Sequence, residues 1–194
     1  MGNGDHRAPS AFTLPAALRV RGYGLRPEGD ADLPFLFALY ASTRAEEIAQ
    51  AQSWSDDQKH AFLAQQFDAQ YRHYRQHFPD SAFDIIEHHG EPIGRLYLER
   101  RDTRLHIIDI ALMPGQRGNG IGTAILTALI DTAAQSGLGV GIFVEKFNPA
   151  LRLYQRLGFV DVSDTGVYLE MERMAENATV TNQRQAQSNC DRLN

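Results

Sequence analysis

The stretch IIDIALMPGQRGNGIGTAILTALI, residues 107–130, joins a strand pattern to an amphipathic helix pattern through four glycines. Glycine takes backbone angles that other residues avoid and lets the chain approach a bulky ligand closely. The N–H groups of a first helical turn have no partner within the helix, and the helix dipole adds positive potential there. We therefore predict a phosphate-binding site in the loop Arg117–Thr123, with the Thr123 hydroxyl as an added donor.

The spacing of the glycines decides which phosphate ligands are compatible with the loop. A P-loop needs Gly, four residues and then Gly-Lys-Ser/Thr, and no lysine stands in this loop. The dinucleotide pattern needs G-x-G-x-x-G, whereas Gly118 and Gly120 are followed by Gly122, one position too early. Both nucleotide readings fail on spacing. A tight turn before a buried helix stays open as the alternative without a ligand.

The sequence on both sides of the loop predicts a mixed sheet with helices on both faces. Segments of alternating or continuous apolar residues are typical of strands, and they are interspersed with segments of helical period. We predict strands over residues 19–25, 82–88, 93–100, 106–112, 140–144, 159–162 and 167–171.

Helices are predicted where capping residues meet apolar stripes. A helix is expected to begin at Asp30 and to continue through Tyr40. Ser55–Gln58 has the pattern of a capping box that opens a long helix. Gly137 is expected to end the helix after the glycine loop, and Asn148-Pro149 to begin a last helix that Gly158 ends.

One folded domain is expected between two looser ends, because 194 residues suit a single domain with a substantial core. We place this domain at residues 20–173. Residues 1–19 are interpreted as a flexible lead-in. Residues 174–194 form a polar tail with too few apolar side chains to bury, so disorder is expected there.

Composition limits the classes of partner. The formal net charge of −5 disfavours nucleic acid and anionic membranes as partners. The apolar runs are too short to span a bilayer, and residues 1–10 lack the apolar core of a signal peptide, so we expect a cytoplasmic protein. The single cysteine, Cys190, allows neither an intramolecular disulfide nor a cysteine metal cluster, and no metal is expected in the site.

Two motifs in register resemble the GNAT acetyltransferase superfamily. The first is Arg117-Gly118-Asn119-Gly120-Ile121-Gly122, which matches Arg/Gln-x-x-Gly-x-Gly/Ala. The second runs from Asn148 to Phe159 and is similar to the closing Asn…Leu-Tyr-x-x-x-Gly-Phe segment. Asn148 stands six residues before Tyr154 instead of the usual seven, so helix capping is at least as good a role for it as contact with the donor. The resemblance covers about residues 25–173.

The resemblance implies a mixed α/β (α+β) fold with helices on both faces of a central sheet. Its sheet is mostly antiparallel, has about six to seven strands, and contains two parallel strands that splay apart. Acetyl-CoA would be the acyl donor, with its pyrophosphate on the loop. The donor-binding residues would be Ile110, Ala111, Leu112, Arg117, Gly118, Asn119, Gly120, Ile121, Gly122, Thr123, Asn148 and Tyr154.

The implied reaction moves an acetyl group to an amine. The Leu112 N–H would polarise the thioester carbonyl, and Tyr154 would protonate the leaving thiolate. Glu99 is the first candidate for the base that deprotonates the amine, although it could equally be a solvated partner of a neighbouring arginine. Water relay also stays open, and further candidate bases are His106, Asp109 and Glu145.

The acceptor side is expected between the first two helices and the last hairpin, in residues 31–78 and 164–168. The acceptor would be a primary amine of a small molecule or a protein. Side chains that could line its pocket are Glu46, Glu47, Trp54, Tyr71 and Tyr74, the last two of which also lie on a core stripe. A catalytically silent acyl-CoA-binding regulatory module is the alternative function, and the resemblance is compatible with a homodimer.

Overall fold

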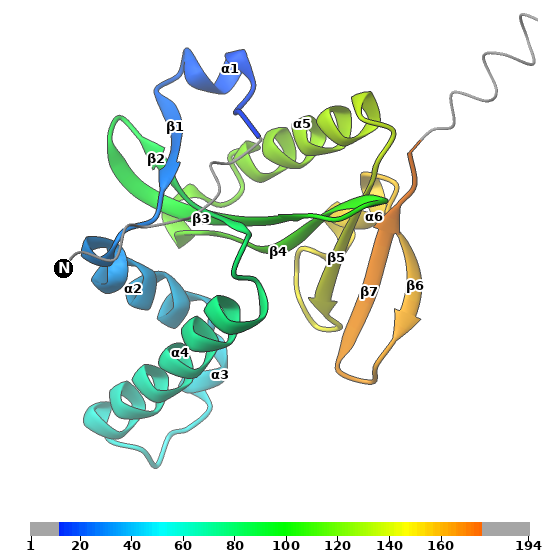
Figure 1. Ribbon diagram of the computed structural model, residues 1–194. Helices are drawn as coiled ribbons and strands as arrows, with labels where there is room; N and C mark the ends of the chain where they lie inside the picture. The colour runs from blue at the N-terminus through cyan, green and yellow to red at the C-terminus, as the bar shows by residue number, and fades with distance from the viewer. Residues whose placement is uncertain (1–11, 176–194) are drawn as a thin grey trace, which may run out of the picture.

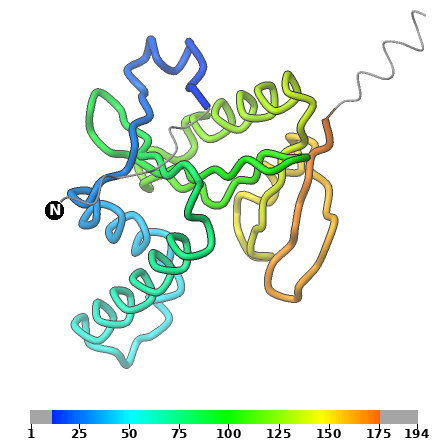
Figure 2. Tube along the Cα trace, viewed as in Figure 1, coloured from blue at the N-terminus to red at the C-terminus, as the bar shows by residue number. Residues whose placement is uncertain are grey.

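A seven-stranded sheet runs through the middle of the molecule, in a computed structural model that describes residues 12–175 (Figure 1, Figure 2). The strand order is β1-β2-β3-β4-β5-β7-β6. The neighbouring strands are antiparallel, except that β4 and β5 are parallel. This confirms the predicted mixed, mostly antiparallel sheet with one parallel pair.

The elements agree closely with the sequence patterns. The strands are β1 (Tyr23–Pro27), β2 (Ala82–His88), β3 (Glu91–Arg100), β4 (Arg104–Leu112), β5 (Gly139–Glu145), β6 (Val160–Asp164) and β7 (Tyr168–Arg173). The helices are α1 (Ala16–Arg19), α2 (Leu33–Thr43), α3 (Ala45–Ala49), α4 (Asp56–His77), α5 (Ile121–Gln135) and α6 (Leu151–Arg156). Two short 3-10 turns are η1 (Asp30–Asp32) and η2 (Pro114–Gln116).

The first strand begins later than the sequence pattern indicates. Residues 16–19 form α1, and Gly22, with φ of +86°, turns the chain into β1. Pro27 lies within β1, which is tolerated because β1 is at the edge of the sheet. Phe12, Leu14 and Leu18 are buried in the main core, so packing begins within the segment that was interpreted as a lead-in. Residues 1–11 and 176–194, including Cys190, lie outside the described part.

The predicted caps at Ser55 and Gly137 are present, whereas the one predicted at Asp30 was wrong, because Asp30 lies in η1 and α2 begins only at Leu33 without a side-chain cap. Ser55 and Gln58 form the capping box: the Ser55 N–H donates to Gln58 Oε1 at 2.8 Å, and the Gln58 N–H donates to Ser55 Oγ at 3.2 Å. Gly137, with φ of +69°, follows α5, and the Leu138 N–H donates to Ala133 O at 2.9 Å, as in a Schellman motif. These local signals fix where the long helices begin and end.

The two faces of the sheet differ in chemistry. Helices α1 and α5 lie on one face and α2 and α4 on the other (Figure 1). The α5 face is apolar, with a core that includes Leu96, Ile107, Ile125, Leu129, Ile142 and Met171. The α4 face contains polar contacts. The buried Glu28 carboxylate accepts hydrogen bonds from Arg75 of α4 and Tyr97 of β3, which ties α4 to the sheet.

The parallel pair β4–β5 is paired over only half of its length. Residues 104–107 of β4 pair with residues 139–142 of β5. Beyond this point β4 continues beside β3, and β5 continues beside β7. A β-bulge accompanies the change, because Leu98 pairs with Ile107 whereas Tyr97 pairs with Asp109, so that Ile108 is the extra residue. The two parallel strands therefore separate after Ile107 and Ile142, and we call this region the split.

At the other end of the sheet, β6 is an exposed edge strand. All five of its residues are exposed, including Val160, Asp161 and Asp164. It pairs with β7 on one side.

Replacement of Gly94 with alanine tests how closely β3 and β4 pack beside the split. A Cβ at Gly94 would lie 2.4 Å from Ala111 O and 2.7 Å from Leu112 Cδ2. Because a backbone oxygen cannot move aside alone, we expect Gly94→Ala to lower the free energy of unfolding by roughly 1–3 kcal/mol. Urea unfolding would measure this. The control is Gly24→Ala in β1, where the nearest atom is 3.9 Å away. Equal losses in the two variants would contradict the prediction.

Candidate active site

The glycine loop follows the end of β4 and leads into α5. Gly118 and Gly120 both have φ of +77°, a backbone region that favours glycine. Gly120 is the N-cap of the 15-residue helix α5, and the Ala124 N–H donates to Gly120 O at 3.0 Å. The N–H groups of residues 121–123 precede this first intrahelical bond. They are the donors that a helix N-terminus offers to an anion.

The space around the loop fits a phosphate group. A Cβ added at Gly118, Gly120 or Gly122 would meet no atom within 4 Å. Ile121 is buried in the core and anchors the start of α5, so its backbone and not its side chain faces the loop. Asn119 and Thr123 are exposed beside it. These glycines are thus free of neighbouring side chains, and the use of the loop as a phosphate site stays a prediction.

Arg117 connects the loop to two other parts of the molecule. Its Nε donates to Leu112 O at 2.8 Å, and its Nη2 donates to Ser42 Oγ of α2 at 3.3 Å. The side chain of Arg117 therefore joins the end of β4, the loop and α2. Because the guanidinium already makes these two bonds, we expect the loop N–H groups to be the main donors to a phosphate.

The edge of β4 at the split presents backbone groups to a ligand. The Met113 N–H donates to Ile93 O at 2.8 Å and so points toward β3. Successive residues of a strand point their N–H groups to opposite sides, so the Leu112 and Ile110 N–H groups point toward the split. An extended arm with amide groups could pair with this edge as an added strand would. Ile110, Ala111 and Leu112 are all half-buried there.

Tyr154 of α6 lies in the core beside the split. It is 4 % exposed, and its ring contacts Phe159 edge to face at 5.6 Å between centroids. Burial raises the pKa of the Tyr154 phenol, and the negative charge of Asp109 raises it further. The phenol is therefore protonated at neutral pH.

The candidate bases occupy two different places. Glu99 and His106 pair across β3 and β4 where β4 is still beside β5, and Glu99 accepts a hydrogen bond from Arg101 Nε at 2.5 Å. Asp109 and Glu145 lie beyond the paired residues, at the split. Glu145 pairs with Arg44 at 3.0 Å. The pairing of Glu99 with a neighbouring arginine, predicted as its alternative role, is present.

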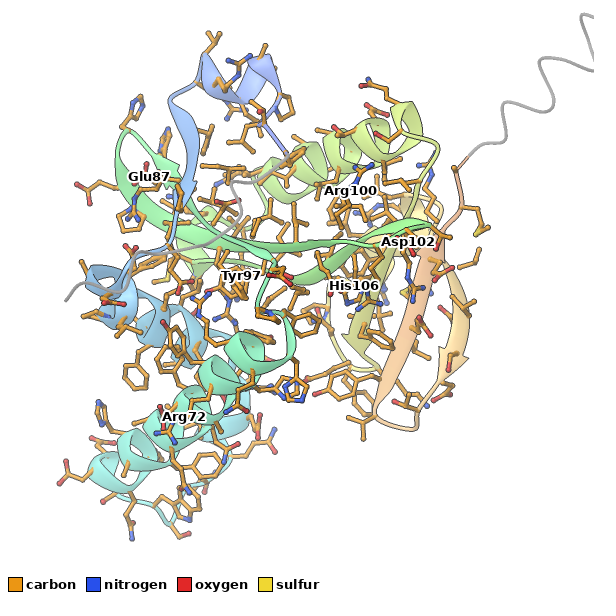
Figure 3. All side chains as sticks on the ribbon, viewed as in Figure 1. Arg72, Glu87, Tyr97, Arg100, Asp102 and His106 are labelled. Carbon is orange, nitrogen blue, oxygen red and sulfur yellow. The ribbon has the colours of Figure 1, made fainter. Side chains whose placement is uncertain are left out.

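His106 is buried in an aromatic environment on the α4 face, where Figure 3 labels it together with Tyr97. It stacks on Phe78 and contacts Phe143 edge to face, with ring centroids 6.4 and 5.6 Å away. Its Nδ1 has no hydrogen-bond partner among residues 12–175. Burial and the charges of Arg101 and Arg104 lower the pKa of His106 to about 4, so the imidazole is neutral at pH 7.

A polar network around Asp109 escaped the sequence analysis as a unit. Asp109 Oδ2 accepts hydrogen bonds from Arg95 Nη2 at 2.5 Å and from the Tyr74 hydroxyl at 3.0 Å. Arg95 Nη2 also donates to Gln70 Oε1 at 3.0 Å. The sequence carries only one local signal for this network, because Arg95 and Tyr97 alternate with Leu96 and so share one face of β3. The partners come from α4 and β4, which no local pattern connects.

The Asn148 side chain forms a hydrogen bond with the backbone. Its Oδ1 accepts a hydrogen bond from the Ala150 N–H at 2.9 Å, just before α6. This bond forms a turn before the helix and is not the predicted cap, because α6 begins at Leu151 and its N-cap is Ala150. Gly158, with φ of +82°, ends the same helix as predicted.

The residues predicted for the acceptor pocket are dispersed. Trp54 packs edge to face on Phe62 at 5.3 Å and anchors the start of α4. Glu47 pairs with Arg44 at 3.5 Å, and Tyr71 lies 4.8 Å from the guanidinium of Arg75. Glu46 is exposed on α3. Tyr74 alone reaches the split, through Asp109.

Among residues 12–175, no group of three or more His, Cys, Asp or Glu side chains is arranged to hold a metal ion. His73 and His77 stack at 4.0 Å between ring centroids without an acidic third ligand.

None of the helices in the described part of the chain is both long and apolar enough to cross a membrane.

Comparisons with known proteins were consistent with this geometry. The model of the acetyltransferase (GNAT) family matches residues 46–159, more than half of the chain. No curated protein matches the sequence. Similar solved structures include the PaiA N-acetyltransferase of Thermoplasma acidophilum in complex with coenzyme A. It is 16 % identical, with 78 % of this chain and 98 % of that chain covered and a TM-score of 0.59.

Two other solved structures share the fold. The spermidine N-acetyltransferase of Vibrio cholerae, in complex with CoA and spermine, is 17 % identical, with 79 % and 96 % of the two chains covered and a TM-score of 0.53. The ribosomal-protein-S18-alanine N-acetyltransferase of Escherichia coli is 19 % identical, with 80 % and 96 % covered and a TM-score of 0.50. At these identities the likeness establishes the fold.

The buried His106 predicts a pH-dependent component of stability. Its pKa is near 4 in the folded chain and near 6.5 when unfolded, so between these values the unfolded chain binds the proton and the folded chain does not. Stability is therefore lost as the pH falls from 7 to 4. Compared with His106→Leu, the wild type should lose up to roughly 3 kcal/mol more over this range. Chemical unfolding at both pH values measures this. Parallel pH curves for the two proteins would contradict it.

Proposed function

Because the chain belongs to the acetyltransferase (GNAT) family, we propose that it is an N-acetyltransferase that moves the acetyl group of acetyl-CoA to a primary amine of a small molecule or a protein. The observation that carries the proposal is the open glycine cradle at the end of β4, directly beside the split between β4 and β5. Bound acetyl-CoA supplies an activated acetyl carbonyl with a thiol as its leaving group.

The loop and β4 together would hold the donor. The N–H groups of residues 121–123 and the dipole of α5 would bind the pyrophosphate. The edge residues Ile110, Ala111 and Leu112 would pair with the pantetheine arm, which runs from the loop back along the split. The position of these half-buried residues beyond the last β4–β5 pair supports this placement.

The transfer requires a donor to the carbonyl oxygen, a base for the amine and an acid for the departing thiolate. The Leu112 N–H, which points toward the split, would donate to the carbonyl oxygen as that oxygen gains negative charge. The acceptor nitrogen forms its bond to the acetyl carbon as the carbon–sulfur bond breaks. The amine loses one proton, and Tyr154 would give one to the departing sulfur. The buried phenol is protonated at neutral pH and has a proton to give, and its raised pKa makes it a weaker acid than a free phenol.

The base that receives the proton of the amine is proposed to be Glu99. Its carboxylate is half-buried and lies next to His106 on the α4 face of the sheet. Glu99 lies where β4 and β5 are still paired, and so at a distance from the split. Water would therefore relay the proton from the amine to Glu99. His106, Asp109 and Glu145 are the alternative acceptors of this proton.

A catalytically silent acyl-CoA-binding module is the second candidate, and it would use the same glycine loop. A thiol-release assay with acetyl-CoA and a broad panel of primary amines separates the two functions. Acetyl-CoA binding without thiol release by any amine would favour the silent module. Thiol release that depends on the amine would support the transferase.

Gly122 provides a test of the donor site that spares the fold. A side chain added at Gly122 would occupy the open space beside the loop, where the pyrophosphate is proposed to bind. Leucine is also a better helix former than glycine, so the substitution should not weaken α5. We expect Gly122→Leu to weaken acetyl-CoA binding at least tenfold in calorimetry, with a free energy of unfolding that is unchanged or higher. The control is Thr127→Leu, an exposed position of the same helix. Equal acetyl-CoA affinity in the two variants would refute the proposed cradle.

Tyr154 provides a test of the proposed acid. Tyr154→Phe keeps the ring and its packing on Phe159 but removes the hydroxyl. Because general acid catalysis contributes about 100-fold or more, we expect turnover to fall by about this factor while the affinity for acetyl-CoA stays the same. Single-turnover thiol release measures the chemical step. If the variant and the wild type release thiol equally fast under these conditions, Tyr154 is not the acid.

A further inference from the structure

We infer that the Asp109 carboxylate binds the ammonium group of the acceptor, and that the acceptor is a primary amine on an apolar or aromatic stem. This inference rests on the proposed function, since it assigns the acceptor side of the same site. It is supported by the position of Asp109, by the bonds that fix its carboxylate, and by the aromatic side chains around it.

Asp109 is placed at the split by the backbone. It is the second residue after the last pair, Ile107–Ile142, and it follows the bulged Ile108. Its side chain is on the α4 face, where it meets Tyr74. A cation held by Asp109 would therefore lie at the split, along which the pantetheine arm of the donor is proposed to run.

The carboxylate is oriented from one side. Arg95 and Tyr74 both donate to Oδ2, and neither of these bonds uses Oδ1. The Arg95 side chain is 5 % exposed, whereas that of Asp109 is 18 % exposed, so the arginine is the buried member of the pair and the aspartate faces outward. Since the Tyr74 hydroxyl gives its proton to Asp109, its oxygen can accept a hydrogen bond from an ammonium group.

The surroundings of Asp109 suit a cation with an apolar stem. Phe143 of β5 and Tyr168 of β7 are each 43 % exposed, and Phe143 is the residue that follows the last β4–β5 pair. Tyr168 pairs in register with Glu145, which also lies beyond the last β4–β5 pair. Aromatic faces attract ammonium groups and pack against apolar stems.

Electrostatics on this part of the sheet also favour a cation. Glu170 and Glu172 of β7 share one guanidinium, that of Arg104. Glu170 pairs in register with Phe143 across β5 and β7. These three side chains therefore carry one negative charge in excess, beside the aromatic residues. This excess would attract an ammonium group toward the split.

Phenethylamine is the probe for this site, and ethanolamine is the matched amine with a polar stem. Calorimetric titration of phenethylamine into the wild-type protein saturated with coenzyme A should show binding tighter than that of ethanolamine. Asp109→Asn keeps an oxygen that accepts from Arg95 but removes the charge. It should weaken phenethylamine binding about tenfold or more and leave acetyl-CoA affinity unchanged. The control is Asp131→Asn, an exposed aspartate of α5.

The inference is overturned if the wild type does not bind phenethylamine, or if the wild type and Asp109→Asn bind it equally. Phe143→Ala covers the case in which Asp109→Asn does not fold, because a half-exposed ring is replaced at little cost in stability. It should reduce the preference for phenethylamine over ethanolamine, and an unchanged preference would also overturn the inference. If the wild type binds phenethylamine but releases no thiol with any amine, the proposed function fails and the binding site stands.

Discussion

The separation of β4 from β5 is the constraint on which the rest of the site depends. The two strands begin side by side, through residues 104–107 and 139–142. Each then keeps one neighbour, β3 or β7, and gives up the other. Sheet backbones need hydrogen-bond partners, so the edge of β4 beyond Ile107 is prepared for an extended group with amides of its own. The glycine loop follows directly at the end of this edge, so the proposed pyrophosphate site and the proposed pantetheine-binding edge are adjacent.

One extra residue in β4 determines which of its side chains lie on the α4 face of the sheet. In a regular strand Ile107 and Asp109 would lie on the same face, and the carboxylate would point into the apolar core. The bulge at Ile108 reverses this relation. Ile107 stays in the core, and Asp109 turns to Arg95 and Tyr74 on the α4 face. The electrostatics of the site are therefore a consequence of backbone register.

Much of the fold could be predicted because its signals are local. The alternation in residues 82–88 gave β2 with its observed bounds, and the Ser55 capping box gave the start of α4. The glycine spacing likewise gave the start of α5. The start of β1 was placed too early, because residues 16–19 have enough helix propensity to form α1 before Gly22 turns the chain.

The remaining parts of the site depend on register and on distant contacts. The run Ile107 to Ile110 resembles a continuous strand, and nothing in it marks Ile108 as bulged. The face of Asp109, and so its contact with Tyr74, could not be derived from it. Tyr74 was assigned to a core stripe, which its contact with Tyr97 supports, but its hydroxyl extends beyond the stripe to β4. Such pairings are decided by tertiary packing.

The exposed strand β6 has a bearing on how the molecules behave toward one another at high concentration. An unpaired edge is a template for strands of other copies, and Val160 and Val162 would favour such stacking. Asp161 and Asp164 lie within the same five residues, so a second copy that approached edge to edge would bring carboxylates near carboxylates. Like charge along this margin therefore opposes edge-to-edge growth of the sheet into fibres.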